Sequence, residues 1–315
     1  MRLMVGLAAA VLLAQQATFR SGVDAVTVDV SVRRGTRVVT GLGVADFEVL
    51  DNGVPQQVTS VSYGKLPIDV TLALDTSFSV SGALLERLRA AVRQLMRDLG
   101  PEDRLRLIDF NMRVSRPIDF TSDPAKIDAA IGAVSAGGGS SIRDALSVAL
   151  VSASEPERRQ LIVLFSDGAD STSITTPEAL IDLAQRTNAS VAAVIPEPGG
   201  AGSPARQGLD MMRALAAETG GTVITMPLAS RTFSAPISRT VPGTTTTTTV
   251  TTFGGRAAAP DLTATFRRVL EEFRSSYVLH FTPRGVEAGG FHTLDVKVKG
   301  KGSLTVRARR GYAVR

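Results

Sequence analysis

The sequence contains no cysteine and no tryptophan, and only two of its 315 residues are histidines. Without cysteine, disulfide bonds and thiolate metal sites are excluded. His280 and His292 lie near the C-terminus without the spacing of metal ligands, which disfavours zinc, and each is interpreted as a strand residue. Aromatic residues make up only 5% of the chain, so we expect no base-stacking surface and no nucleic-acid partner.

Long apolar runs are also scarce. The run at the N-terminus extends from Leu3 to Ala14 and is shorter than the roughly 20 residues that a transmembrane helix needs. A short apolar run after a single positive charge is typical of a secretory signal peptide, and we assign residues 1–17 to it. We therefore expect a secreted or periplasmic protein with no membrane span once the signal has been removed.

Basic residues exceed acidic ones, with 35 Lys or Arg against 30 Asp or Glu and a formal net charge of +5. The stretch from Lys297 to Arg315 contains seven basic residues and no acidic one, which would suit contact with an acidic surface such as anionic lipid. Its basic residues alternate with apolar or small ones, however, as on the solvent-facing side of paired antiparallel strands. We prefer the second interpretation, which leaves Arg307 and Arg309 in solvent.

Two apolar runs in the middle of the chain, 68–74 and 161–165, have the length and composition of buried strands, and each leads into an aspartate. A glycine-rich loop at 137–139 lies between them and precedes a helical pattern. Open α/β sheets bind ligands at the carboxyl ends of their strands, so we expect oxygen-bearing side chains to meet there. Oxygen ligands suit a hard cation such as Mg²⁺. The candidate ligands are Asp75, Ser77, Ser79, Ser140 and Asp167.

This pattern resembles the von Willebrand factor type A domain and its metal-ion-dependent adhesion site. The family's motif has D-x-S-x-S, a Thr in a glycine-rich loop, and an Asp after a later strand. The chain departs from it at Ser140, which keeps the hydroxyl but lacks the methyl group that stiffens a threonine rotamer. The resemblance implies a bound Mg²⁺, with Mn²⁺ or Ca²⁺ as alternatives. It also implies a protein partner that presents an Asp or Glu carboxylate to the metal.

The resemblance further implies that Ser77, Ser79 and Ser140 bind the metal directly, while Asp75 and Asp167 act mostly through bound water. Two neighbouring residues carry separate expectations. Phe78 either presents its ring beside the metal or packs under the loop. Asp144 lies three residues after Ser141, and we interpret this pair as a capping box at the start of a helix.

Strands and helices alternate through residues 66–275, which predicts an α/β fold with a doubly wound, mostly parallel, Rossmann-like sheet. Within it, residues 229–260 include six consecutive threonines and are interpreted as a low-complexity insertion. The flanks at 18–65 and 276–315 alternate polar and apolar residues, suggesting one small β-sandwich built from both ends of the chain. The arrangement resembles bacterial exported proteins with a type A domain between β-rich flanks.

The favoured function is an exported, Mg²⁺-dependent protein-binding module of the adhesion type without catalysis. One alternative is a structural component of a cell-envelope assembly whose metal site is idle. A metal-dependent hydrolase is a weaker alternative, because the chain has no G-x-S-x-G, P-loop or G-x-G-x-x-G motif. In addition, no histidine is near Ser77, Ser79 or Ser140 in the sequence.

Overall fold

A computed structural model of the chain describes residues 25–64, 66–152, 157–197, 203–226, 236–241, 244–249, 261–300 and 302–314. The expected signal peptide and most of the expected low-complexity insertion lie outside these residues. Within that insertion, the described strands β12 (Pro236–Val241) and β13 (Thr244–Thr249) pair with each other as an antiparallel hairpin. None of the helices in the described part of the chain is both long and apolar enough to span a bilayer.

The central unit is a six-stranded sheet in the order β11-β10-β9-β6-β7-β8. All its neighbouring strands are parallel except β7 and β8, which pair antiparallel at one edge. The α/β prediction is therefore confirmed. Its strands are β6 (Ile68–Asp75), β7 (Arg104–Phe110), β8 (Val114–Thr121), β9 (Arg159–Phe165), β10 (Ser190–Pro196) and β11 (Thr222–Met226).

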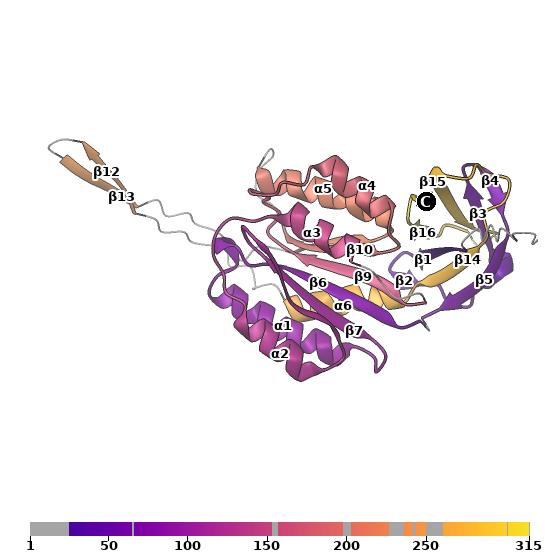
Figure 1. The fold of residues 1–315 in the computed structure, drawn as a ribbon, viewed down its shortest axis with the longest axis horizontal. Coiled ribbons are helices and arrows are strands. Elements are labelled where there is room, and N and C mark those ends of the chain that lie inside the picture. Colours follow the sequence, from indigo (N-terminus) through magenta and orange to yellow (C-terminus); the bar gives the residue numbers. More distant parts are fainter. Residues whose placement is uncertain are drawn as a thin grey trace, which may run out of the picture.

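Helices cover both faces of this sheet (Figure 1). Strand β6 is buried throughout because alternate side chains enter different cores: Leu72 and Leu74 pack towards α1, α2 and α6, whereas Ala73 packs towards α3, α4 and α5. The helices are α1 (Ala83–Asp98), α2 (Pro124–Ala133), α3 (Ile142–Val151), α4 (Pro177–Gln185), α5 (Pro204–Thr219) and α6 (Leu262–Arg274).

The second unit consists of two antiparallel sheets whose strands come from both ends of the chain. One sheet has the order β16-β1-β14-β5, with β2 on β1, and the other has the order β17-β15-β3-β4. A shared apolar core that includes Val30, Val49 and Leu279 lies between them. We call this unit the β-rich module. Its elements are β1 (Val26–Arg34), β2 (Arg37–Val38), the short helix η1 (Val44–Asp46), β3 (Phe47–Asp51), β4 (Val54–Gln56), β5 (Val58–Tyr63), β14 (Tyr277–Phe281), β15 (Gly290–Val298), β16 (Thr305–Ala308) and β17 (Gly311–Val314).

Arg159, the first residue of β9, is a buried link between the two units. Its guanidinium donates hydrogen bonds to Asp29 Oδ1 on β1 at 2.7 Å, to the Phe273 carbonyl oxygen at 2.7 Å and to Ser276 Oγ at 2.6 Å. It also lies over the Phe273 ring, 3.9 Å from the ring centroid. Because the residue is only 4% exposed, these contacts replace most of the hydration of its charge.

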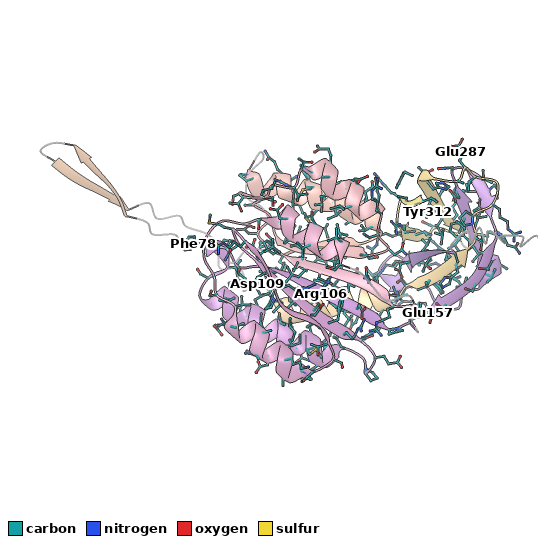
Figure 2. The ribbon with its side chains drawn as sticks, viewed as in Figure 1. Phe78, Arg106, Asp109, Glu157, Glu287 and Tyr312 are labelled. Atoms are coloured by element: carbon teal, nitrogen blue, oxygen red, sulfur yellow. The ribbon has the colours of Figure 1, made fainter. Side chains whose placement is uncertain are left out.

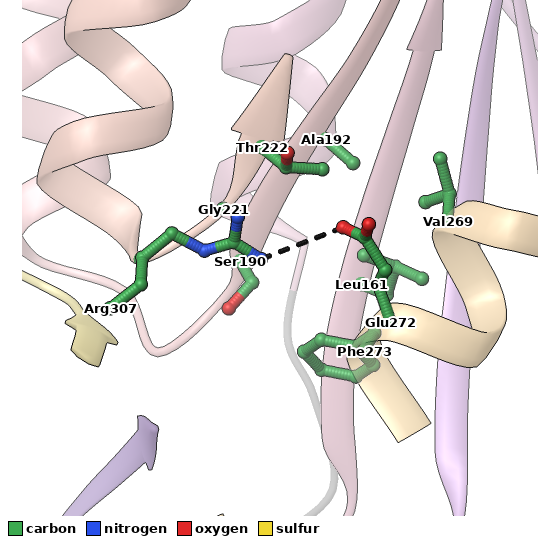
Figure 3. A pocket seen from close by; sticks show the side chains of 10 residues that line it. Leu161, Ser190, Ala192, Gly221, Thr222, Val269, Glu272, Phe273 and Arg307 are labelled. Carbon is green, nitrogen blue, oxygen red and sulfur yellow. Dashed lines mark ion pairs between the residues drawn. The ribbon is translucent and has the colours of Figure 1, made fainter. Parts of the chain in front are cut away.

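The expectation of solvent-facing basic residues at the C-terminus holds for Lys297 and Lys299, which are exposed, but was wrong for Arg309. Arg309 is 5% exposed, and its guanidinium donates to the Thr187 carbonyl oxygen at 2.6 Å and to Asn188 Oδ1 at 3.0 Å. Burial lowers the pKa of Arg309 to about 10. Half-buried Arg307 pairs with Glu272 of α6 at 3.7 Å, beside a small pocket between β9, β10, β11 and α6 (Figure 3). The alternation of polar and apolar residues along a strand cannot distinguish a solvent-exposed face from a face that another unit covers.

Asp69 in β6 is expected to make the protein acid-sensitive. Burial opposes ionisation of Asp69, but hydrogen bonds from Arg104 and Arg158 outweigh it and hold the pKa of this carboxyl below its ordinary value. The stabilisation is therefore complete above the unfolded pKa of about 3.9 and is lost as pH falls through the lower folded pKa. Melting temperatures should differ between wild type and Asp69→Asn by several degrees at pH 7, and the gap should narrow by pH 3. The exposed pair Asp182–Arg186 provides the control. At pH 7 and at pH 3, Asp182→Asn should melt at nearly the same temperature as wild type.

Candidate metal site

Asp75 is the last residue of β6 and has no exposed surface. Its carboxylate accepts hydrogen bonds at both oxygens: Oδ1 from the Ser77 backbone N–H at 2.8 Å, and Oδ2 from Ser140 Oγ at 2.9 Å and Ser166 Oγ at 2.6 Å. Three serines on three segments of the chain thus converge on one carboxylate. Ser166 follows β9 directly and was missed in the sequence, although its position at the end of a strand beside β6 was a usable signal.

Ser77 and Ser79 lie on the short turn that follows β6. Their hydroxyl oxygens are 3.0 Å apart, because the turn η2 (Phe78–Val80) bends the chain immediately after Ser77. Ser77 is buried. Phe78 is 73% exposed (Figure 2), so of the two interpretations left open, packing under the loop does not occur.

The glycine-rich loop holds Ser140 in place against this turn. The Gly137 N–H donates to the Thr76 carbonyl oxygen at 2.7 Å, and the Phe78 N–H donates to the Gly138 carbonyl oxygen at 3.1 Å. Gly138 has φ +78°, and a Cβ at Gly139 would lie 2.8 Å from Ser171 Oγ. Larger residues would therefore disrupt the close approach of the loop.

Asp167 lies in the loop after β9, and β9 is the strand next to β6. Its Oδ1 accepts from the Ala169 N–H at 3.1 Å. Burial raises the pKa of the Asp75 carboxyl, and the negative charge of Asp167 raises it further. Hydrogen bonds from Ser166 and Ser77 oppose this increase in pKa. No ion pair within the described ranges joins Asp75 or Asp167 to a basic side chain. Two nearby carboxylates without a compensating charge favour a bound cation.

The donor set of this edge fits a hard cation such as Mg²⁺, because it consists of carboxylate and hydroxyl oxygens. Hydrogen bonds connect Asp75 with Ser77 and Ser140, and a further one connects Ser77 with Ser79. Asp167 interacts with Asp75 through its negative charge. In the part of the chain that the structure covers, no group of three or more His, Cys, Asp or Glu side chains could hold a metal. A metal at this edge therefore depends on the serine hydroxyls.

Asp144 does not form the capping box predicted with Ser141. The Ser141 side chain makes no capping hydrogen bond; its Oγ donates instead to the Asn111 carbonyl oxygen at 2.7 Å. The Asp144 carboxylate accepts from the Ile174 N–H at 3.0 Å and the Thr175 N–H at 2.8 Å. This prediction was wrong because a loop distant in sequence supplies the better donors, and Asp144 attaches that loop to the first turn of α3.

Residues 70–169 match the family model of the von Willebrand factor type A domain. The chain is similar to human inter-alpha-trypsin inhibitor heavy chain H4, with 29% identity over 128 residues that cover 36% of this chain and 14% of that protein. The chain thus matches only about a seventh of the length of this curated relative.

Two solved bacterial structures are also similar. An aerotolerance-related membrane protein from Bacteroides fragilis NCTC 9343 matches at 17% identity and a TM-score of 0.45, covering 65% of this chain and 98% of that one. The von Willebrand factor domain of a type V pilus tip protein from Porphyromonas gingivalis matches at 15% identity and a TM-score of 0.42, covering 51% and 90%.

Proposed function

Since the chain contains a von Willebrand factor type A domain, we propose that it is a metal-dependent protein-binding module. Domains of this family generally mediate protein–protein interaction. One observation carries the proposal: buried Asp75 accepts hydrogen bonds from the Ser140 and Ser166 hydroxyls and from the Ser77 backbone N–H. Asp167 lies beside it, and no ion pair in the described part of the chain compensates the two carboxylates. A divalent cation would supply that compensation and would offer a positive centre to an incoming carboxylate.

Within this proposal, Mg²⁺ is the metal, with Mn²⁺ or Ca²⁺ as alternatives. Ser77, Ser79 and Ser140 would hold it directly, and Asp75 and Asp167 would act mostly through water. The partner is a protein that presents an Asp or Glu carboxylate. We further propose that residues 1–17 direct export, that the type A domain extends over 66–275, and that it is inserted between the β-rich flanks 18–65 and 276–315.

A thermal-shift titration with Mg²⁺, Mn²⁺ and Ca²⁺ tests the metal site. A ligand that binds only the folded state adds about 2.7 kcal/mol of stability at a hundredfold excess over its Kd, so a saturable rise in melting temperature is expected. Asp167→Ala should abolish the rise. Asp167 is preferred to Asp75 for substitution because it is only half-buried, so its replacement is less disruptive to the fold.

The matched control is Asp210→Ala, which removes an exposed aspartate that pairs with Arg213 on α5. This variant should respond to the metal as wild type does. The proposal fails if no ion raises the melting temperature of wild type. If Asp167→Ala responds like wild type, the ion binds at another place.

A further inference from the structure

Large apolar side chains are exposed around the candidate metal site. Six large hydrophobic residues are exposed in the described part of the chain, and three of them are Phe78 at 73%, Met112 at 63% and Ile174 at 92%. They lie in the loops that follow β6, β7 and β9, which are adjacent in the sheet. We call these three residues the apolar collar. Figure 2 shows Phe78 at the end of the α/β unit away from Tyr312 of the β-rich module.

Contacts with the glycine-rich loop and the start of α3 hold the collar around the site. The Phe78 N–H donates to the Gly138 carbonyl oxygen at 3.1 Å, and a Cβ at Gly138 would lie 3.1 Å from Met112 Cγ. The Ile174 N–H donates to the Asp144 carboxylate in the first turn of α3, which begins just after Ser140. Each collar residue is thus attached to the segment that carries Ser140.

A positively charged side chain, Arg113, lies next to the apolar collar. A single exposed hydrophobic residue is ordinary, but three on adjacent loops around a polar centre are typical of an interaction surface. Arg113 follows Met112 in the same turn, is exposed, and has no ion pair with any residue that the structure describes. A bound cation and Arg113 would both attract a negative group, while the collar would cover apolar groups on either side of it.

We propose that the apolar collar selects a protein segment whose Asp or Glu carboxylate is flanked by large apolar side chains. This inference rests on the proposed function, because the carboxylate reaches the metal. The metal would supply the attraction common to every acidic partner. The collar would discriminate among them, because burial of its apolar surface rewards only partners with matching flanks.

Binding of short fluorescent peptides in saturating Mg²⁺ tests this proposal. One peptide carries a central glutamate between leucine and phenylalanine pairs, the second carries the same glutamate between serine pairs, and the third replaces the glutamate of the first by glutamine. Wild type should bind the apolar-flanked glutamate at least about tenfold more tightly than either of the other peptides. In the double variant Phe78→Ser, Ile174→Ser, this preference should fall to within about twofold.

The control variant is Val151→Ser, which removes an exposed apolar residue (62%) at the far end of α3 and should keep the preference. Fluorescence anisotropy measures binding, and the thermal shift with Mg²⁺ is measured on the same samples. If Mg²⁺ raises the melting temperature normally but wild type binds both glutamate peptides equally, or binds neither, the proposed role of the apolar collar is wrong and the metal site stands. Absence of the metal shift in wild type overturns the proposed function itself. Concentration-dependent self-association that Phe78→Ser abolishes would assign the collar to a second copy of the chain and would also overturn this proposal.

Discussion

Replacing Arg159 with alanine is expected to lower the free energy of unfolding by about 3–5 kcal/mol, because it leaves the Asp29 carboxylate, whose side chain is only 18% exposed, without its partner. Arg159 is the charged partner of Asp29, and it also satisfies the Phe273 carbonyl oxygen and Ser276 Oγ. Burial already raises the pKa of Asp29, and the interaction with Arg159 opposes that shift. Without the guanidinium, Asp29 must take up a proton or draw water into the junction between the units. Urea unfolding followed by far-ultraviolet circular dichroism at pH 7 measures the loss.

The double variant Asp29→Asn, Arg159→Met distinguishes the loss of the ion pair from the cost of leaving one of its charges unpaired. Replacing both charges together avoids an unpaired ion, so the double variant should be clearly more stable than Arg159→Ala alone. Arg186→Ala removes an exposed arginine paired with Asp182 and should change stability little. Equal losses in Arg159→Ala and Arg186→Ala would contradict the view that Arg159 joins the two units.

Replacing Asp51 with alanine is expected to destabilise the β-rich module by about 2–4 kcal/mol, because it removes the buried carboxylate that two buried polar side chains share. Asp51 has no exposed surface; its Oδ1 contacts His292 Nδ1 at 2.8 Å, and its Oδ2 accepts from the Tyr312 hydroxyl at 2.6 Å. Burial and the hydrogen bond to Asp51 together raise the pKa of Tyr312 well above its ordinary value. His292 Nε2 is buried without a hydrogen-bond partner among the described residues, so the polar contacts of the imidazole are those of Nδ1, with Asp51 and, at 3.2 Å, with the Tyr312 hydroxyl.

Tyr312→Phe tests the same cluster more gently. It removes one hydroxyl and leaves the contact between Asp51 and His292, so a loss of about 1–2 kcal/mol is expected. Asp295→Ala is the control, because Asp295 lies in the same module but its side chain is about half exposed and pairs with exposed Lys297. If Asp51→Ala costs no more than Asp295→Ala in urea unfolding, the cluster does not stabilise the module.

The sequence by itself determined the α/β class and the position of the aspartates at the strand ends. A strand buried on both faces is mostly apolar, so the runs 68–74 and 161–165 could be recognised from composition, and a carboxylate after such a run must lie where the strand leaves the core. The placement of Asp75 and Asp167 at one edge also follows from this pattern, since parallel neighbouring strands end at the same edge. Ser166 was missed even so, because a single hydroxyl has no periodic signal.

Only the tertiary structure decided which polar side chains are buried and what they contact. The partners of Asp144 lie 30 and 31 residues away, so local spacing suggested a helix cap that does not form. Arg309 follows β16 and continues its alternation of polar and apolar residues, which suggested a solvent-facing side chain, but the α/β unit covers it and provides carbonyl acceptors. His292 and Asp51 are 241 residues apart and meet because strands from the two ends of the chain pair. Local sequence encodes the periodicity of an element, whereas the burial of a charge depends on which distant element packs against it.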